Sequence, residues 1–302
     1  MEQTQGESDL LFEALAEVQR ETDTVFDALL PVPEDGRARL VEAMRYAVLD
    51  GGKRVRPFLV VSTARLFGAD HDSAVLAGCA IESIHAYSLI HDDLPCMDDD
   101  NLRRGKPTVH RAFDEATAVL AGDSLHALAF EILSDPRTSG DPFIRADLVA
   151  ALSRASGKDG MAGGQMMDIS AAEQDMTLHT ITRLQQLKTG ALLGAAVEMG
   201  AILSRVPAEG RSALRNYARD IGLAFQIADD LLDHDGDEAR TGKALRKDKD
   251  QGKLTFVSLM GSEKAREQAH RLAQQAIGHL GGFGPDANVM RQLANYIVER
   301  DR

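Results

Sequence analysis

The sequence predicts an all-α protein, and three observations support that prediction. The 302-residue chain is 44% hydrophobic, yet it has no Trp and only 5% aromatic residues. Its core must therefore come mostly from Ala, Leu, Ile and Val, a mixture that suits closely packed helices. Apolar residues recur at helical spacing along most of the chain, whereas no segment of useful length alternates as a strand does. No linker, low-complexity tract or fixed-period repeat interrupts it, so we expect one domain over residues 1–302.

Two amphipathic helices are predicted near the start of the chain. Leu11, Leu15 and Val18 mark the apolar stripe of the first. A second stripe covers 40–48 and stops before Gly51-Gly52, because glycine is a helix breaker. This glycine pair also opens the basic segment GGKRVRP.

Further helices are expected along the rest of the chain, separated by Gly and Pro breaks. Their approximate ranges are 55–67, 71–93, 115–133, 143–156, 176–204, 208–234, 262–280 and 286–299. Gly163-Gly164 is interpreted as one of the breaks between them. The chain is therefore expected to be helical almost throughout.

Charge and composition limit the classes of partner. The net charge of −13 disfavours nucleic acid and anionic membrane surfaces as partners. The start, MEQTQGESDL, lacks the features of a signal or transit peptide. The longest apolar run, GALLGAAVEMGAIL, is interrupted by Glu198, so no membrane-spanning segment or anchor is expected. Cys79 and Cys96 lack metal-ligand spacing. These features predict a soluble cytoplasmic protein.

An aspartate cluster ends one of the apolar helices. Asp92, Asp93 and Asp98 follow the run SIHAYSLI. His85, Ser88 and Asp92 recur at helical spacing and form one stripe on that helix. Neighbouring carboxylates repel one another unless cations neutralise them. The cluster therefore predicts a cation site at the mouth of an apolar interior.

A second aspartate cluster repeats this arrangement. Asp229, Asp230 and Asp233 follow the apolar run IGLAFQIA, and Gln226 lies one turn before Asp229 and Asp233 on the same helix face. Either cluster alone could be a solvated acidic turn. Two clusters that each end an apolar helix favour a shared site. Carboxylates without thiols or a His triad suit hard cations, above all Mg²⁺, which completes its shell with water and phosphate oxygens.

Basic residues appear at complementary places. They are Lys53, Arg54, Arg56, Arg103, Arg104, Lys188, Lys243 and Lys253. Many follow Gly or lie at predicted helix ends, where backbone can approach an anion. No Walker loop or EF-hand loop has its required residues. The cations are therefore candidates for binding phosphate groups next to the aspartates.

These motifs resemble those of the trans-polyprenyl diphosphate synthases. DDLPCMDDDNLRRGKPT and AFQIADDLLDHDGD are similar to the two aspartate-rich motifs of that family. DGGKRVRP, IHAYSLIHDD, AGDSL, LKTGALL, TGK and QGKLTF resemble its remaining motifs in the same order, from Asp50 to Phe256. The six-residue span from Asp92 to Asp98 is like that of bacterial farnesyl synthases and of bacterial and plant geranylgeranyl synthases.

The resemblance implies an isoprenoid synthase fold, in which helices surround a deep central cavity, usually as a homodimer. It also implies a magnesium cluster between the two aspartate motifs. Asp92, Asp98 and Asp229 would be the leading metal ligands, supported by Asp93 and Asp233.

The resemblance also assigns roles to the other matching residues. The expected catalytic residues are Lys188, Thr189 and Gln226. Lys188 would hold the allylic diphosphate, while the other two would present oxygens to the allylic cation. Arg103 and Lys243 would share that diphosphate, and Lys253 would add positive charge over the leaving group. The residues expected to hold isopentenyl diphosphate are Lys53, Arg56, His85 and Arg104.

The implied reaction joins isopentenyl diphosphate to dimethylallyl or geranyl diphosphate and releases diphosphate. No protein base is assigned, because the released diphosphate is the family's candidate for accepting the proton. His85 is interpreted as a diphosphate ligand, with a structural helix histidine as the alternative. A terpene cyclase or a catalytically silent partner subunit are rival hypotheses, but a cyclase's second motif differs and silent subunits usually lose an aspartate motif.

Tyr87 and Ser88 are expected to set product length. Tyr87 lies five residues before Asp92, so about 7–8 Å further down the helix axis. In the family an aromatic residue here commonly forms the cavity floor, which implies the fifteen-carbon farnesyl product. The twenty-carbon geranylgeranyl product stays open, because LPCMD around Cys96 resembles geranylgeranyl synthases. Tyr87 could also be an ordinary buried aromatic.

Overall fold

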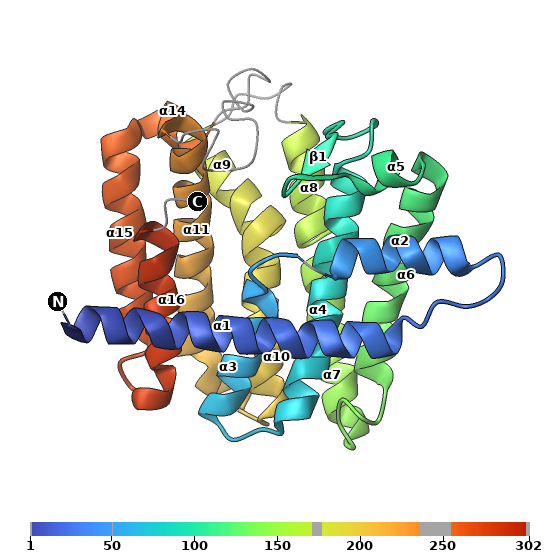
Figure 1. Ribbon diagram of the computed structural model, residues 1–302. Coiled ribbons are helices and arrows are strands. Elements are labelled where there is room, and N and C mark those ends of the chain that lie inside the picture. The colour runs from blue at the N-terminus through green and yellow to red at the C-terminus, as the bar shows by residue number, and fades with distance from the viewer. Residues whose placement is uncertain (1, 50, 171–176, 236–254, 300–302) are drawn as a thin grey trace.

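The protein is a bundle of helices (Figure 1), described here by a computed structural model over residues 2–49, 51–170, 177–235 and 255–299. Its elements in chain order are α1 (Glu2–Leu29), α2 (Ala38–Val48), α3 (Val55–Leu66), α4 (His71–Asp92), β1 (Leu102–Arg103), β2 (Lys106–Pro107), α5 (Val109–Ala112), α6 (Glu115–Ser134), α7 (Pro142–Ser156), α8 (Met161–Ile169), α9 (Leu178–Gln185), the π-helix η2 (Gln186–Gly190), α10 (Ala191–Leu203), η3 (Ala208–Arg211), α11 (Ser212–Asp235), α14 (Phe256–Met260), α15 (Ser262–His279), η4 (Pro285–Ala287) and α16 (Asn288–Glu299). The all-α prediction is confirmed. In the described part of the chain, the only sheet is the antiparallel hairpin β1–β2.

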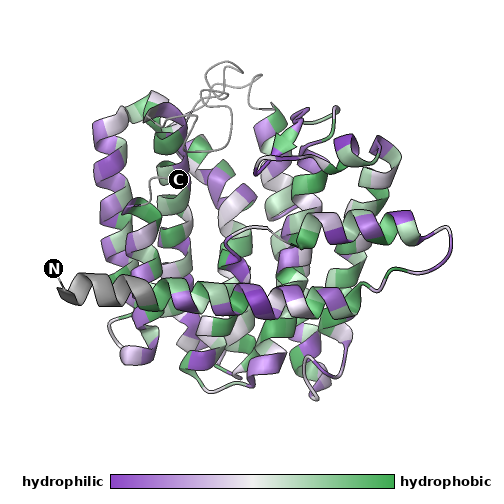
Figure 2. Cartoon of the chain, in the orientation of Figure 1, coloured by the Kyte–Doolittle hydropathy of each residue, from purple (hydrophilic) through white to green (hydrophobic). Residues whose placement is uncertain are grey.

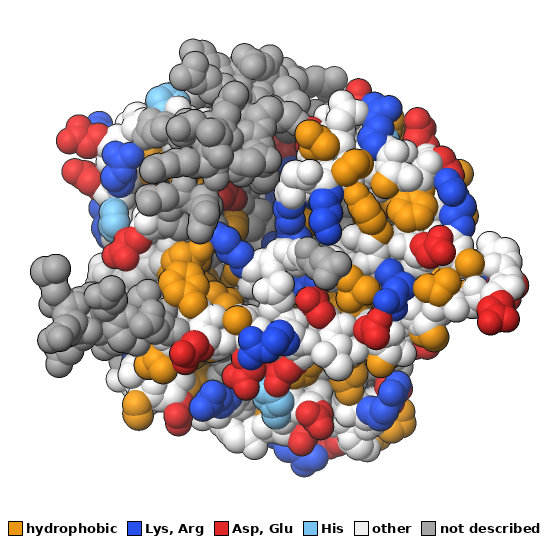
Figure 3. Space-filling model, in the orientation of Figure 1, with side chains coloured by type: hydrophobic (Ala, Val, Ile, Leu, Met, Phe, Trp, Pro, Cys, Tyr) orange, Lys and Arg blue, Asp and Glu red, His pale blue; other side chains and the backbone are white. Residues whose placement is uncertain are grey.

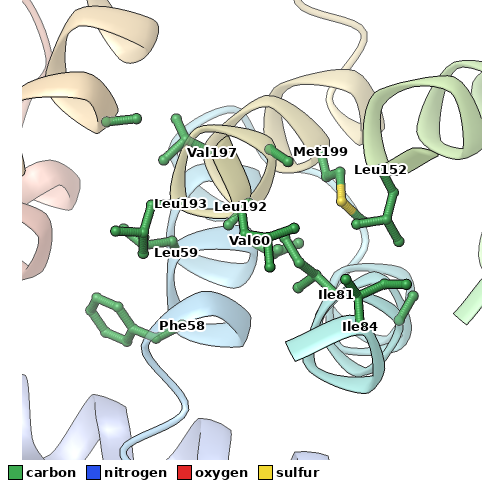
Figure 4. Close-up of a cluster of buried hydrophobic side chains, with 14 of the residues drawn as sticks. Phe58, Leu59, Val60, Ile81, Ile84, Leu152, Leu192, Leu193, Val197 and Met199 are labelled. Atoms are coloured by element: carbon green, nitrogen blue, oxygen red, sulfur yellow. The ribbon is translucent and has the colours of Figure 1, made fainter. Parts of the chain in front are cut away.

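The centre of the bundle is built from α3, α4 and α10. Their buried side chains are mostly aliphatic or small, with Phe58 on α3 as an aromatic member, and they pack together as Figure 4 shows. Gly200 on α10 allows the closest approach, because a Cβ there would lie 2.6 Å from the Val60 carbonyl oxygen and 2.9 Å from the Ala64 nitrogen on α3. The small side chains predicted to form the core therefore let backbones approach closely, as expected for a helical core without Trp.

The outer helices bury one face each. The stripe predicted on α1 is confirmed, since Leu11, Leu15 and Val18 are buried, and α1 lies across the other helices in Figure 1. Figure 2 shows the contrast in hydropathy between the largely apolar α4 and α10 and the more polar α15 at the side of the bundle. Amphipathic helices of this kind shield the apolar centre from water.

The helix ends follow local capping rules. Asp70 accepts a hydrogen bond from the Ser73 backbone N–H at 2.9 Å and begins α4. Asp114 does the same for α6 through the Thr117 N–H at 2.7 Å. That backbone hydrogen bond, with help from Arg39, lowers the pKa of Asp114 to about 2. Each aspartate satisfies a backbone donor that the first turn leaves open.

Three expectations about the helices were wrong in detail. The helix expected over 176–204 is divided, in its described part, by η2 between α9 and α10. Gly163-Gly164 does not break the chain, because both residues lie inside α8. The hairpin, α5 and α14 were not anticipated. They are too short for a periodic pattern to reveal.

Within the described residues, two helices are long and apolar enough to cross a membrane. They are α4 and α6, of 22 and 20 residues. In α4, 67% of the apolar window is buried inside the molecule, and in α6 half of it is. The core helix of a soluble protein passes the same test, so this is weak evidence for a membrane span. Counting unbroken apolar runs did not single out these helices, because mean hydropathy tolerates scattered polar residues.

Candidate active site

A cavity of about 290 Å³ lies beside the C-terminal half of α4. Seven of the predicted site residues line it: Arg56, His85, Tyr87, Ser88, Asp92, Lys188 and Thr189. The predicted stripe His85–Ser88–Asp92 therefore faces one space. The opposite wall comes from α8 and η2, which contribute Met161, Gln165 and Lys188. The cavity is mainly apolar with charged groups at one end.

The first aspartate cluster folds back on itself. After α4 ends, the Asp98 N–H donates to the Asp92 carbonyl oxygen at 2.9 Å, and the Asp100 N–H donates to that of Asp93 at 3.1 Å. Burial raises the pKa of Asp92 to about 6; the negative charge of Asp98 adds to the rise, and Lys188 opposes it. Asp92 is thus a half-buried carboxylate near a second carboxylate. This donor set fits a hard divalent cation, which would relieve both the burial and the repulsion.

Asp93 has a different task from its neighbour. It is 2% exposed and accepts three hydrogen bonds from Arg103: Nε lies 2.9 Å from each carboxylate oxygen and Nη2 lies 2.6 Å from Oδ1. Such a forked pair fixes both side chains. Arg103, expected to hold the allylic diphosphate, is thereby anchored close enough for its charge to act on Asp92 and His85.

The hairpin places Arg104 at its tip. Arg104 and Gly105 have φ of 54° and 75°, which is typical of a two-residue type I′ turn. The side chain of Arg104 reaches the loop before α3, where a Cβ on Gly52 would lie 2.6 Å from its Nη1. Gly52, at φ 81°, therefore meets two requirements at once: it adopts the left-handed conformation and leaves space for the guanidinium.

Four arginines surround His85. Burial lowers its pKa well below the usual value, and the charges of Arg56, Arg104, Arg103 and Arg54 lower it further. Burial also lowers the pKa of Arg56 and of Arg104, and the two guanidiniums repel each other's charge. Positive charges gathered around a neutral imidazole repel one another unless an anion binds among them. The arrangement fits the expected diphosphate site.

Arg54 supports this group from behind. Its side chain is 2% exposed and pairs with Glu82 on α4 at 3.0 Å and with Asp23 on α1 at 2.7 Å. It also donates to the Val48 carbonyl oxygen at the end of α2. Arg54 thus ties three helices to the loop that leads to Arg56.

Lys188 lies on the π-helix η2, as functional residues often do. Its Nζ is 2.6 Å from Oδ2 of Asp168 on α8. The two elements meet at Gly164, where a Cβ would lie 2.2 Å from the Lys188 nitrogen. Asp168 and Gln165 were missed by the sequence reasoning. The signal was present in GGQMMD, where a glycine that permits close packing precedes an aspartate by one helical turn.

The second aspartate cluster lies on α11, and its residues separate into two kinds. Asp229 is exposed, whereas Asp230 is buried and accepts the Phe256 N–H at 2.8 Å at the start of α14. Asp229 acts on the charge of Arg56 across the interior. Gly222 of α11 lies against η2, since its Cβ would be 3.3 Å from the Gly190 Cα. Gln226 is half-buried on the same helix but is not among the residues that line the cavity next to α4.

Figure 1 shows the elements that follow the two aspartate helices, β1 after α4 and α14 after α11, at the same end of the bundle. Figure 3 shows Lys and Arg side chains at the edge of a recess between the two halves of this face. Among the residues that the structure describes, no three His, Cys, Asp or Glu side chains form a ready-made metal cluster. The two aspartate motifs lie on different helices, α4 and α11.

The remaining described residues of the predicted site are not among those that line this cavity: Lys53, Asp98, Arg103, Arg104, Gln226 and Asp229. Lys53 is exposed, and its Nζ lies 5.1 Å from the centroid of the Tyr296 ring on α16. Lys243 and Lys253 lie outside the described residues.

Tyr87 and Ser88 lie in the cavity wall, as expected. The Tyr87 ring meets His126 of α6 edge-on at 5.0 Å and His91 at 5.7 Å. His126 in turn contacts Phe130 at 5.2 Å. Tyr87 is therefore backed by a second layer of rings. Sequence reasoning could not reveal this layer, because it comes from another helix.

Comparison with known proteins agrees with this architecture. Residues 37–291 match the Polyprenyl synthetase family. A farnesyl diphosphate synthase of Haemophilus influenzae is 45% identical over 291 residues, covering 95% of this chain and 98% of that protein. A chloroplastic geranylgeranyl pyrophosphate synthase of Arabidopsis thaliana is 44% identical and covers 93% of this chain and 80% of its own length.

Structural similarity is equally extensive. The apo crystal structure of an FPP/GFPP synthase from Zymomonas mobilis is 56% identical, with a TM-score of 0.87, and covers 96% of this chain and 99% of that one. Its all-α isoprenoid synthase fold is the fold expected here. Given a family match across most of its length and relatives of this similarity, the chain belongs to the polyprenyl synthetase family.

Proposed function

We propose that this protein condenses isopentenyl diphosphate head-to-tail with dimethylallyl and then geranyl diphosphate to give farnesyl diphosphate, releasing diphosphate each time. One observation supports it above all. A single, mainly apolar cavity is lined by Asp92 and Lys188, by Arg56 and His85, and by Tyr87. Relatives with the names farnesyl diphosphate synthase and FPP/GFPP synthase are consistent with this product. Geranylgeranyl diphosphate stays the alternative, because relatives of that name are almost as similar.

Mg²⁺ is the proposed cofactor, held by Asp92 and Asp98 on one wall and Asp229 on the other. Bound magnesium would neutralise the diphosphate of the allylic substrate as it leaves. The raised pKa of Asp92 supports this assignment, since a carboxylate destabilised by burial and by Asp98 gains most from a cation.

The basic residues divide the two substrates between them. Lys188 and Arg103, each already held by a carboxylate, would bind the allylic diphosphate beside the metal ligands. Arg56, His85 and Arg104 would bind isopentenyl diphosphate. His85 is proposed as a hydrogen-bond partner rather than a base, because its low pKa makes it a weak proton acceptor at neutral pH. Lys53, Lys243 and Lys253 are proposed for the same anions on the resemblance alone.

The reaction itself needs little chemistry from the side chains. The allylic C–O bond breaks, the isopentenyl double bond attacks the resulting cation, and a proton leaves the new chain to the released diphosphate. Thr189 and Gln226 would present oxygens to the cation. The apolar walls, including Met161 and Met166, exclude water that would quench it.

We further propose that the chain works as a soluble cytoplasmic homodimer with no nucleic-acid partner. The half-exposed helix α6 supports the dimer, because Val119 and Leu120 are 40% and 55% exposed on it. Such apolar side chains are typical of a surface that another subunit covers.

Product analysis tests the function directly. The purified chain is incubated with labelled isopentenyl diphosphate, Mg²⁺ and each allylic primer in turn, and the chain length of the products is determined. We expect farnesyl diphosphate from dimethylallyl and geranyl primers. Conversion of farnesyl diphosphate to a hydrocarbon without isopentenyl diphosphate would instead indicate a cyclase. No turnover under any of these conditions would indicate a silent subunit.

A further inference from the structure

The last turn of α4 carries a histidine, His91, directly before the proposed metal ligand Asp92. The helix ends there with the carboxylates of Asp92 and Asp93. Negative charge at the C-terminal end of a helix opposes the helix dipole, and the last carbonyl groups of a helix lack partners within it. The turn that carries Asp92 is therefore weak by itself and needs support from another part of the fold.

That support comes from α6. His91 is half-buried, and its Nε2 lies 3.1 Å from the Val119 carbonyl oxygen. Because a carbonyl oxygen can only accept, Nε2 carries a hydrogen and donates it. The His91 ring also meets the Tyr87 ring, one turn earlier on α4, edge-on at 5.7 Å. The imidazole therefore joins the end of α4 to α6.

Gly122 on α6 makes room for this contact. A Cβ at Gly122 would lie 2.2 Å from His91 Nε2 and 2.5 Å from its Cδ2. In a helix each Cβ tilts toward the N-terminus, so a side chain at position 122 would cover the preceding turn, which contains Val119. Glycine leaves that carbonyl oxygen open to the imidazole. This gives a physical reason for the motif AGDSL, to which the proposed reaction assigns no role.

The backbone around His91 leads directly to the first aspartate cluster. The His91 carbonyl oxygen accepts the Leu94 N–H at 3.2 Å. The Asp92 carbonyl oxygen accepts the Asp98 N–H at 2.9 Å. His91 is thus held on α6 by its side chain and lies, through its backbone, in the turn that connects Asp92 to Asp98. A displacement of His91 would move both carboxylates.

We propose that His91 is a positioning residue for the metal-binding carboxylates Asp92 and Asp98, and that Gly122 serves the same role by giving the imidazole its place against α6. The inference rests on the proposed function, because the assignment of these two aspartates as magnesium ligands belongs to that proposal. Groups that orient metal ligands commonly contribute to metal affinity. The contact between His91 and Val119 holds the last turn of α4 in place, so that a cation need not order this turn as it binds.

Metal binding in the absence of turnover tests this role. Mn²⁺ with inorganic diphosphate is the probe, and electron paramagnetic resonance measures the free Mn²⁺. Gly122→Ala should weaken Mn²⁺ binding about tenfold or more, because the new Cβ displaces the imidazole. His91→Ala should weaken it to a similar extent. His91→Gln should stay close to wild type, since its amide nitrogen can still donate to the Val119 oxygen. Gly194→Ala is the matched control, because a Cβ at that position inside α10 meets nothing within 4 Å.

Turnover gives a second measurement. Gly122→Ala should lower kcat about tenfold and raise the Mg²⁺ concentration needed for half-maximal rate, while KM for isopentenyl diphosphate stays near the wild-type value. The double variant His91→Ala with Gly122→Ala should be no worse than His91→Ala alone, because the new Cβ then has free space. A packing defect unrelated to the metal ligands would lower the melting temperature and leave Mn²⁺ affinity unchanged.

Two results would overturn the inference. One is unchanged Mn²⁺ affinity in Gly122→Ala and His91→Ala that are correctly folded by circular dichroism. The other is an equal loss of affinity in His91→Gln and His91→Ala, since that excludes the hydrogen bond to Val119. With product still formed by wild type, either result rejects the role of His91 and leaves the proposed function standing. A wild type that binds Mn²⁺ but forms no prenyl product rejects the proposed function, while weaker Mn²⁺ binding in Gly122→Ala still supports the role of His91.

Discussion

Each aspartate motif contains an Asp-Asp pair, and the two residues of the pair have different roles. The contacts that hold the second residue differ between the two motifs. In each Asp-Asp pair the first residue keeps access to solvent, while the second is buried and holds the next element of the chain. Asp93 binds Arg103 and thereby the hairpin. Asp230 accepts the Phe256 N–H and thereby begins α14.

The difference lies in charge and burial. Asp92 is half-buried and is influenced by the charge of Lys188, whereas Asp229 is exposed. Asp93 has a cationic partner, and the bond found for Asp230 comes from a neutral backbone N–H. At the end of α4, the carboxylates of Asp92 and Asp93 therefore lie near the positive charges of Lys188 and Arg103, and each charge stabilises the other. Substitutions in the two motifs should therefore differ in kind as well as in size.

The largest effects should come from the first aspartate of each pair, Asp92 and Asp229. Asp92→Ala and Asp229→Ala should each lower kcat by about 10³-fold or more, because each removes charge stabilisation that matters most when the C–O bond ionises. Asp92→Ala should be the more severe, since Asp92 is the less exposed of the two. Single-turnover rates with Mg²⁺ and both substrates measure this, and excess chelator should abolish wild-type turnover. Near-normal rates in either variant would remove that residue from the metal site.

The second-largest effect is expected at Arg56. Arg56 faces the α4 cavity and also interacts with Asp229 across the interior. Arg56→Ala should raise KM for isopentenyl diphosphate by about tenfold to 100-fold, as expected for loss of a charged hydrogen bond to phosphate. KM for the allylic substrate should change little. An equal rise for both substrates would contradict the proposed division, and Arg65→Ala at the other end of α3 serves as the control.

Substitutions of the two buried aspartates, Asp93 and Asp230, should lower the free energy of unfolding by different amounts. Asp93→Asn leaves Arg103 without its carboxylate in a mostly buried place, so unfolding free energy should fall by about 3 kcal/mol. Asp230→Asn keeps an oxygen for the Phe256 N–H and should lose only about 1 kcal/mol. Urea unfolding of the two variants beside wild type gives the comparison. Equal losses of unfolding free energy would mean that Asp93 and Asp230 stabilise the fold to the same extent.

The smallest effect on rate, and the most specific on product, is expected at Tyr87. Tyr87→Ala should leave turnover within about tenfold of wild type, because the residue touches neither diphosphate site. It should shift the products toward twenty carbons or more by opening the wall in front of His126. Tyr87→Phe keeps the ring and is the matched control. If wild type already makes mainly the twenty-carbon product, or if Tyr87→Ala leaves the distribution unchanged, Tyr87 is not the floor.

Much of the fold was predictable because its signals are local. The ends of α4 and α11 follow the predictions to within one residue, since each helix carries a clear apolar pattern that ends at an aspartate motif. Convergence of His85, Ser88 and Asp92 on one cavity follows from helical spacing alone. The interruption at η2 could not be predicted, because a π-turn differs from an α-turn by one backbone bond that no residue pattern requires.

The sequence by itself determined the helical class, the two aspartate motifs and the face on which each lies, because period and residue type are properties of neighbours in the chain. Tertiary structure decided which carboxylates have a positively charged partner and where the guanidinium of Arg104 lies. Asp168 forms an ion pair with Lys188, and Asp93 forms one with Arg103. Gly52 leaves space for the guanidinium of Arg104. Each of these contacts joins separate elements of the fold. Its strength depends on burial and close approach, which arise only when the helices pack.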